Sequence, residues 1–499
     1  MKSSEALAYL KEKDRYLTTL GHISGILSWD METVMPSKAE EERVEQMSLL
    51  ALLMHSTKLD DKLKDAVYSI ETDGLSDADK ALVREYKREL GMASKVPSSL
   101  VKAMSEETAK AHSKWVEARS ENKFSIFQPS LENLVSLSKE YASAIGNGDY
   151  NTLLNLYERG MTEEKIDSLF DELESSIHTI MDKIEGKKVD TSFLNVIKYD
   201  VKKEEEFCSQ IAKKMGFDFS RGAIGIVQHP FTTSLGRDDI RISNRFTDES
   251  FVDPIFSIIH ETGHALYEMN AALNSEIRGT SLSQGTSMGV HESQSRFWEN
   301  LMGRSLPFWK YFYPSLQSYI PQLKDISLEQ FVIASNYPHS SAIRVNADEL
   351  TYSLHIILRY RIEKALFNGS LAVKDIPEAW DKGSESIIRY SVKSDSEGCL
   401  QDSHWSGGSF GYFPSYALGN LYSAAFLEKL YLDCGGKSRV DEALEKGEFG
   451  LITSWQDKNI WHYGAIYEPN TLMKRVTGKE LSAKPFIKYL EDKFYSLYL

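Results

Sequence analysis

Apolar residues recur every three or four positions through most of the chain. The clearest run is followed by Gly186, and its members are Ile166, Leu169, Phe170, Leu173, Ile177, Ile180, Met181 and Ile184. This spacing places apolar side chains on one face of an α-helix, and glycine is common just beyond a helix end. The N-terminal segment has the same spacing of apolar residues, at Leu7, Leu10, Leu17 and Leu20. We therefore predict a mainly α-helical protein.

One segment, residues 224–246, departs from helical spacing. It contains two β-rich runs joined through residues 236–238, which predicts a small β-hairpin. The apolar run at residues 254–259 follows directly and predicts a helix, with Asp253 as its N-cap and Pro254 at its first position.

The composition is that of a globular protein, with 41% apolar and 26% charged residues in 499. No stretch approaches the roughly 18 consecutive apolar residues of a membrane span. We find no segment typical of a flexible linker. We predict one domain, residues 1–499, in which residues 1–190 form an N-terminal helical lobe and residues 191–499 a second lobe that carries the candidate site.

The charge and cysteine content narrow the class of protein further. A formal net charge of −15 argues against nucleic-acid binding, which needs clustered positive charge. Three cysteines are too few for a disulfide framework, and the N-terminus lacks the apolar core of a signal peptide. We therefore expect a cytoplasmic protein with no membrane partner.

The segment His260-Glu261-Thr262-Gly263-His264 carries the most specific chemistry of the chain. Residues four apart share one face of a helix, so His260 and His264 can bind a single metal ion. Glu261 lies about 100° further round the helix, where it can accept a proton from a metal-bound water. The pattern is typical of zinc-dependent peptidases, although it also occurs by chance in unrelated helices.

A catalytic zinc usually keeps three protein ligands and one open position. Glu292, in a downstream segment with helical pattern, is the candidate third ligand, although alone it would be taken for a surface carboxylate. His291 competes with it but would point about 100° away on the same helix. Cobalt fits the same donors as zinc.

A glycine inside a helix is unfavourable, so Gly263 indicates that another part of the structure approaches the helix closely at this residue. The approaching group is either a strand or the substrate backbone, or it is a packed helix.

Five further motifs accompany the metal motif in order along the chain: His229-Pro230-Phe231, Asp239-Ile240-Arg241-Ile242-Ser243, His291-Glu292-Ser293-Gln294, Ile343-Arg344-Val345-Asn346-Ala347-Asp348, and Gly398-Cys399-Leu400-Gln401-Asp402-Ser403-His404-Trp405. Together they resemble the fingerprints of the carboxypeptidase Taq family of zinc metallocarboxypeptidases. Ser243 stands where the family has threonine, which keeps the hydroxyl and loses a methyl group.

The resemblance implies a large, helical, clam-like metallopeptidase fold with zinc deep in an active-site groove and a small sheet near the metal helix. It also implies a homodimer. The implied activity is release of single C-terminal amino acids, with broad specificity, from peptides with a free C-terminus.

Two residues are candidates to stabilise the oxyanion of the tetrahedral intermediate. They are His404 and Tyr416, and each could instead be an ordinary core residue. We expect Cys399 to be a small buried thiol and not a nucleophile, because proximity to His404 in sequence supplies neither a base nor a lowered pKa.

An exopeptidase also needs a group for the substrate α-carboxylate, and a guanidinium binds a carboxylate bidentately. Arg344 is the first candidate, with a helical salt bridge to Asp348 as the alternative. Arg241 is the second, although it could simply hold the hairpin, which could itself align a substrate strand. Other residues expected to line the groove or orient neighbours are His229, Gln401 and Asp402.

Two other functions fit the same sequence features. A zinc oligoendopeptidase or dipeptidyl carboxypeptidase would use the same metal chemistry on a different bond. A catalytically silent peptide-binding protein would keep the fold, but the intact Glu261 argues against it.

Overall fold

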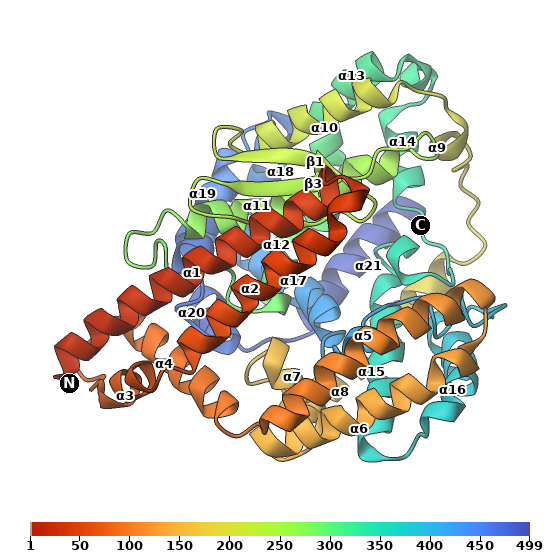
Figure 1. Cartoon of the computed structure of the whole chain (residues 1–499). Coiled ribbons are helices and arrows are strands. Elements are labelled where there is room, and N and C mark those ends of the chain that lie inside the picture. Colours follow the sequence, from red (N-terminus) through yellow and green to blue (C-terminus); the bar gives the residue numbers. More distant parts are fainter. Residues whose placement is uncertain (1) are drawn as a thin grey trace.

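The computed structural model describes residues 2–499, which form twenty-one α-helices and one three-stranded sheet (Figure 1). The prediction of a mainly helical fold with a small sheet is confirmed. Apolar periodicity accounts for the helices: in α8 (Glu163–Ile184) seven of the eight predicted apolar residues are buried, and Met181 packs against the same core.

Ten helices precede the sheet: α1 (Ser3–Thr33), α2 (Glu40–Lys58), α3 (Asp61–Ser69), α4 (Asp77–Ala93), α5 (Ser98–Glu121), α6 (Gln128–Ile145), α7 (Tyr150–Tyr157), α8, α9 (Phe193–Val196) and α10 (Val201–Met215). Eleven follow it: α11 (Val252–Ala271), α12 (Met288–Arg296), α13 (Leu306–Tyr319), α14 (Leu328–Ser335), α15 (Tyr352–Asn368), α16 (Ile376–Gly383), α17 (Pro414–Asp433), α18 (Lys437–Glu445), α19 (Gly450–Asn459), α20 (Pro469–Thr477) and α21 (Lys484–Tyr498). Within residues 2–499, every helix is too short or too polar to cross a membrane.

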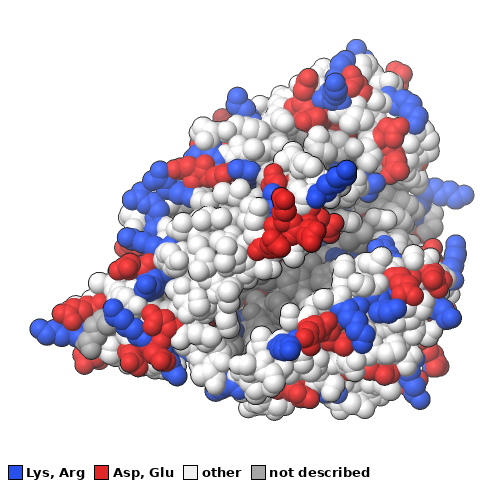
Figure 2. All heavy atoms as spheres, viewed as in Figure 1, with Lys and Arg blue, Asp and Glu red and all other residues white. Residues whose placement is uncertain are grey.

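Two groups of helices face each other across a groove. In Figure 1 the sheet, α10, α13 and α14 belong to the upper group, whereas α5, α6, α8, α15 and α16 belong to the lower group. Figure 2 shows the surface hollowed between them. One hydrophobic core contains buried residues of both groups, and α8 packs on α15 and α21. The division of the chain at residue 190 stays a prediction.

The sheet lies against the metal-motif helix and has the order β1-β3-β2. Its strands are β1 (Gly222–Ile226), β2 (Thr232–Ser234) and β3 (Ile240–Asn244). The predicted turn at residues 236–238 joins β2 to β3 as an antiparallel hairpin, whereas β1 pairs with β3 in parallel. Strand β2 is therefore an edge strand, and both β2 and β3 pack on α11.

Helix α11 begins earlier than predicted. Its N-cap is Phe251, without a side-chain cap bond, and Val252 is its first residue. Asp253 is therefore the second helical residue and not the cap, and Pro254 is the third residue and not the first. Phe251 is fully buried and stacks on Phe331 at 6.4 Å between ring centroids, so tertiary packing sets the start of the helix.

Gly263 is the point at which α11 meets α12. A Cβ atom at this position would lie 2.6 Å from the Gln294 carbonyl oxygen and 2.8 Å from the Ser295 Cα. Of the two predicted reasons for the glycine, packing against a helix is the one observed. The close approach brings the face of α12 that carries Glu292 towards the two motif histidines.

Glu204 of α10 is fully buried, and within residues 2–499 neither of its carboxyl oxygens has a hydrogen-bond partner. Burial raises the pKa of Glu204 to about 9, and the charge of Asp253 adds to the effect. This folded-state pKa lies above the ordinary carboxyl value, so the folded protein binds a proton that the unfolded chain releases. The resulting stability is lost as pH rises from about 4.5 to about 9, by at most about 1.4 kcal/mol per pH unit.

We therefore expect Glu204→Gln to make the free energy of unfolding less dependent on pH. Relative to the native chain, the variant should gain stability at about pH 8 and change little at about pH 5, as measured by urea unfolding. Glu206→Gln, at an exposed position of the same helix, is the matched control. The same stability difference at both pH values would contradict this assignment.

Candidate active site and metal centre

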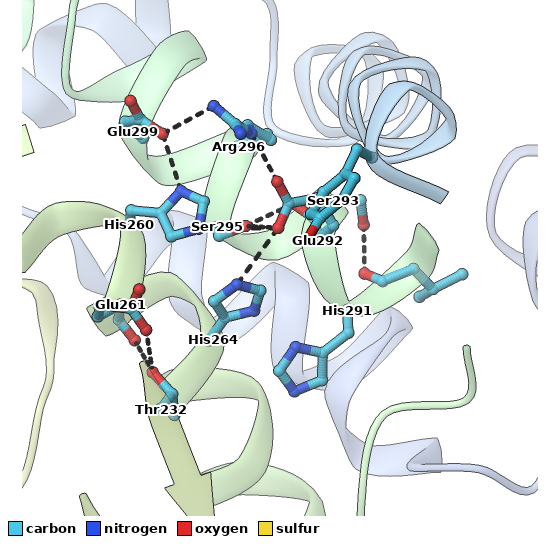
Figure 3. A network of polar contacts seen from close by, with 12 residues as sticks. Thr232, His260, Glu261, His264, His291, Glu292, Ser293, Ser295, Arg296 and Glu299 are labelled. Atoms are coloured by element: carbon cyan, nitrogen blue, oxygen red, sulfur yellow. Dashed lines mark hydrogen bonds and ion pairs between the residues drawn. The ribbon is translucent and has the colours of Figure 1, made fainter. Parts of the chain in front are cut away.

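Two helices present three metal-binding side chains to one point. His260 and His264 project from α11 and Glu292 from α12, and one ligand atom of each lies within 4.8 Å of the others. Glu292 Oε2 is 3.7 Å from His260 Nε2 and 3.3 Å from His264 Nε2 (Figure 3). Two imidazole nitrogens and one carboxylate form a donor set that fits a catalytic divalent metal such as zinc.

His260 is held by a carboxylate that the sequence analysis missed. Glu299 lies in a π-helical turn, η3 (Phe297–Met302), that continues α12, and its Oε2 is 2.8 Å from His260 Nδ1. This contact points His260 Nε2 at the metal position, as is usual for metal-binding histidines. Burial alone would lower the His260 pKa, but the Glu292 and Glu299 charges raise it above its ordinary value. The spacing of seven residues between the two glutamates was the available sequence signal.

Glu292 is buried and ionised. Burial alone would raise its pKa, but the Arg296 guanidinium and the two imidazoles hold the pKa well below its ordinary value. Arg296 Nε donates to Glu292 Oε1 at 2.7 Å, and Ser295 Oγ donates to Oε2 at 3.0 Å. Oε2 is therefore the oxygen that faces the two histidines.

His264 is suited to be a neutral ligand, because burial and then the neighbouring His291 lower its pKa to about 3. The two rings stack with centroids 4.5 Å apart. His291, the competing ligand candidate, instead lies with its Nε2 2.8 Å from Glu268 Oε1.

Glu261 lies beside the metal position and contacts the edge strand. Thr232 of β2 donates its hydroxyl to Glu261 Oε2 at 2.6 Å, a contact that sequence reasoning did not identify (Figure 3). Burial raises the Glu261 pKa above its ordinary value, while His260 and the Thr232 bond oppose the shift. A carboxylate with a raised pKa is a stronger base, and this arrangement suits proton transfer.

His404 and Tyr416 are neighbours, with the His404 Nε2 and Tyr416 Oη atoms 3.2 Å apart. Burial lowers the His404 pKa to about 4, so the ring is neutral at pH 7. Tyr416 lies one turn before Gly419 on α17, and a Cβ at Gly419 would be 2.7 Å from Glu292 Cγ. Burial and neighbouring phenols raise the Tyr416 pKa, and the Glu292 charge contributes.

Arg344 belongs to a buried cluster of charges. Its Nε and Nη2 donate to Asp402 Oδ1 at 3.0 and 2.9 Å, and its Nη1 donates to Tyr352 Oη at 3.1 Å. Asp402 also accepts from Arg359 Nε at 2.7 Å. The alternative pairing with Asp348 is wrong, because Asp348 accepts from the turn that starts α15.

The other residues predicted to bind substrate are Gln401, Arg241 and His229, and each lies in a different environment. Gln401 accepts from the Arg344 backbone N–H at 2.8 Å and donates to the Ala342 carbonyl at 2.9 Å, so it holds the backbone that carries Arg344. Arg241 forms a bidentate pair with Asp239, at 2.7 Å for both bonds. His229 is exposed, just before β2.

Comparison with known proteins matches residues 9–494 to the family described as Carboxypeptidase Taq (M32) metallopeptidase. Carboxypeptidase 1 of Bacillus subtilis is 38% identical over 506 residues, which cover 99% of this chain and 100% of the relative. Thermostable carboxypeptidase 1 of Thermus thermophilus is 37% identical over 516 residues, which cover 100% of both chains. The solved structure of an M32 carboxypeptidase from Deinococcus radiodurans has a TM-score of 0.94 at 33% identity, over 99% of each chain.

The family match, the relatives and the fold likeness all extend over nearly the whole chain. They agree with the donor set of two histidines and one glutamate that α11 and α12 bring together. The chain therefore belongs to the carboxypeptidase Taq (M32) family and is a metallocarboxypeptidase.

Proposed function

We propose that this chain is a zinc-dependent carboxypeptidase that releases single C-terminal amino acids, with broad specificity, from peptides with a free C-terminus. The observation that carries the proposal is a buried, positively charged cluster in the same molecule as the metal donor set. Arg344 and Arg359 share one carboxylate, Asp402. The cluster therefore keeps one net positive charge, which a substrate carboxylate would neutralise.

His260, His264 and Glu292 would hold the zinc ion, and cobalt suits the same donors. When bound, the metal polarises the scissile carbonyl and lowers the pKa of a bound water towards about 7. Glu261 takes the proton of the attacking water and then passes it to the leaving amine. Its bond to Thr232 orients the carboxylate for both transfers.

His404 and Tyr416 are the proposed donors to the oxyanion of the tetrahedral intermediate. The raised pKa of Tyr416 keeps its hydroxyl protonated, so that it can donate a hydrogen bond. The 3.2 Å contact between the two side chains holds them as a pair.

Arg344 is the proposed anchor for the substrate α-carboxylate. Its rival Arg241 is paired one-to-one with Asp239, and that pair has no net positive charge for a substrate carboxylate to neutralise. Gln401 acts on Arg344 through the backbone, and His229 is proposed to line the groove.

A homodimer and a cytoplasmic location complete the proposal. The family resemblance supports the dimer, for which light scattering of the purified chain is the test. All three cysteines are free thiols in residues 2–499, as suits a reducing compartment.

Digestion of one peptide with a free C-terminus and of its amide tests the proposed activity. Mass spectrometry should show residues lost one at a time from the free peptide only. A metal chelator should stop the loss, and added zinc or cobalt should restore it. Internal cleavage, dipeptide release or equal cleavage of the amide would instead favour an oligoendopeptidase or dipeptidyl carboxypeptidase.

Glu261→Gln should lower kcat by about 10²- to 10⁴-fold or more, because the amide cannot accept a proton. The zinc content of the purified variant should stay at the native level, since Glu261 is not a proposed ligand. Thr232→Ser, which keeps the hydroxyl, is the matched variant that should retain most activity. Near-native turnover by Glu261→Gln would remove the residue from the mechanism.

Arg344→Met should lower kcat/KM for free peptides by about 100-fold, because the carboxylate of the substrate loses its buried partner. Arg359 still pairs with Asp402 in this variant, so the variant leaves no buried carboxylate without a positive partner. Arg241→Met is the control and should change kcat/KM by only a few fold. The reverse ranking of the two variants would transfer the anchoring role to Arg241.

A further inference from the structure

The two carboxyl oxygens of Glu292 have different partners. Oε2 faces the imidazoles at 3.3 and 3.7 Å, and Oε1 points away from them and accepts from Arg296 Nε at 2.7 Å. A glutamate can bind a metal through one oxygen or through both. The arginine therefore holds Oε1 on the side away from the imidazoles, so that Oε2 is the oxygen that faces the metal position.

The same arginine reaches the support of the first histidine. Arg296 Nη1 is 3.2 Å from Glu299 Oε2, and that oxygen is also 2.8 Å from His260 Nδ1. Figure 3 shows the resulting chain of contacts from Glu292 through Arg296 and Glu299 to His260. One guanidinium thus connects two of the three ligands on the side away from the metal position.

The surroundings hold Arg296 in place. Its side chain is 13% exposed, and its guanidinium lies over the Tyr352 ring, 4.2 Å from the centroid. Tyr352 in turn accepts from Arg344 Nη1. A planar guanidinium can contact two carboxylates and an aromatic face at once, whereas a lysine ammonium cannot reproduce that geometry.

We propose that Arg296 is a positioning residue that restricts Glu292 to one-oxygen coordination of the metal and, through Glu299, fixes His260. The inference rests on the metal site of the proposed function. One-oxygen coordination preserves the open position that a catalytic zinc needs for water. Two-oxygen coordination would instead bring the number of protein donor atoms from three to four.

Arg296→Lys tests the proposal by two readouts that need no peptide. Competition with a chelator should give a zinc affinity about 10- to 100-fold below native, the usual effect of losing a partner behind a metal ligand. X-ray absorption of the zinc-loaded variant should show one more oxygen neighbour than the native protein. Arg304→Lys is the matched control, since Arg304 contacts Glu299 at Oε1, 3.5 Å away, whereas His260 and Arg296 share Oε2.

A lower affinity and an added oxygen neighbour in Arg296→Lys, with native values in Arg304→Lys, support the proposal. Native affinity and coordination in Arg296→Lys, or equal losses in both variants, overturn it. If Arg296→Lys does not fold, Glu299→Gln decides: it removes the charge that holds both Arg296 and His260, so an unchanged zinc affinity overturns the proposal. Because no peptide is involved, these outcomes are independent of whether residues leave singly from the C-terminus.

Discussion

The position of α12 between two glycines is the constraint on which the site depends. Gly263 of α11 lies against the α12 backbone, and Gly419 of α17 lies against Glu292 itself. A side chain at either glycine would overlap atoms of α12, and a close-packed interior offers little room for adjustment. The two contacts bring a ligand from one helix within reach of the two ligands on another. They also bring α17, which carries Tyr416, alongside.

Charge pairing supports this packing. Buried ions are tolerated only when they are paired and hydrogen-bonded, and the site has two such clusters. Arg296 serves Glu292 and Glu299 in one, while Asp402 serves Arg344 and Arg359 in the other. In the first cluster Arg296 contacts both carboxylates and Arg304 contacts Glu299 alone, which leaves Glu292 Oε2 to face the two histidines.

The second cluster has two guanidiniums for one carboxylate and suits an anion. Tyr352 lies between the clusters, with its ring against Arg296 and its hydroxyl bonded to Arg344. The side chain of Tyr352 therefore connects the arginine behind the metal donor set to the proposed carboxylate anchor.

Local sequence patterns were sufficient for the helical fold, the hairpin turn at residues 236–238 and the pairing of His260 with His264, because each depends on neighbours in the chain. They failed at the start of α11, where Phe251 packs on a distant ring. They also did not identify Asp402 as the carboxylate that Arg344 contacts. Arg359 and Thr232 were missed for the same reason, since each meets its partner far along the chain. Long-range packing leaves no periodic signal in one sequence.

The sequence by itself indicated the kind of chemistry: two imidazoles four residues apart, a carboxylate beside the first and a glutamate downstream are typical of a catalytic metal site. Only the tertiary structure decided how each donor is oriented. Contacts between residues decide three features of the site: the oxygen of Glu292 that faces the histidines, the group that holds His260, and the arginine cluster that keeps a net positive charge. Those contacts arise from burial and shape, which act between residues that are remote in the chain.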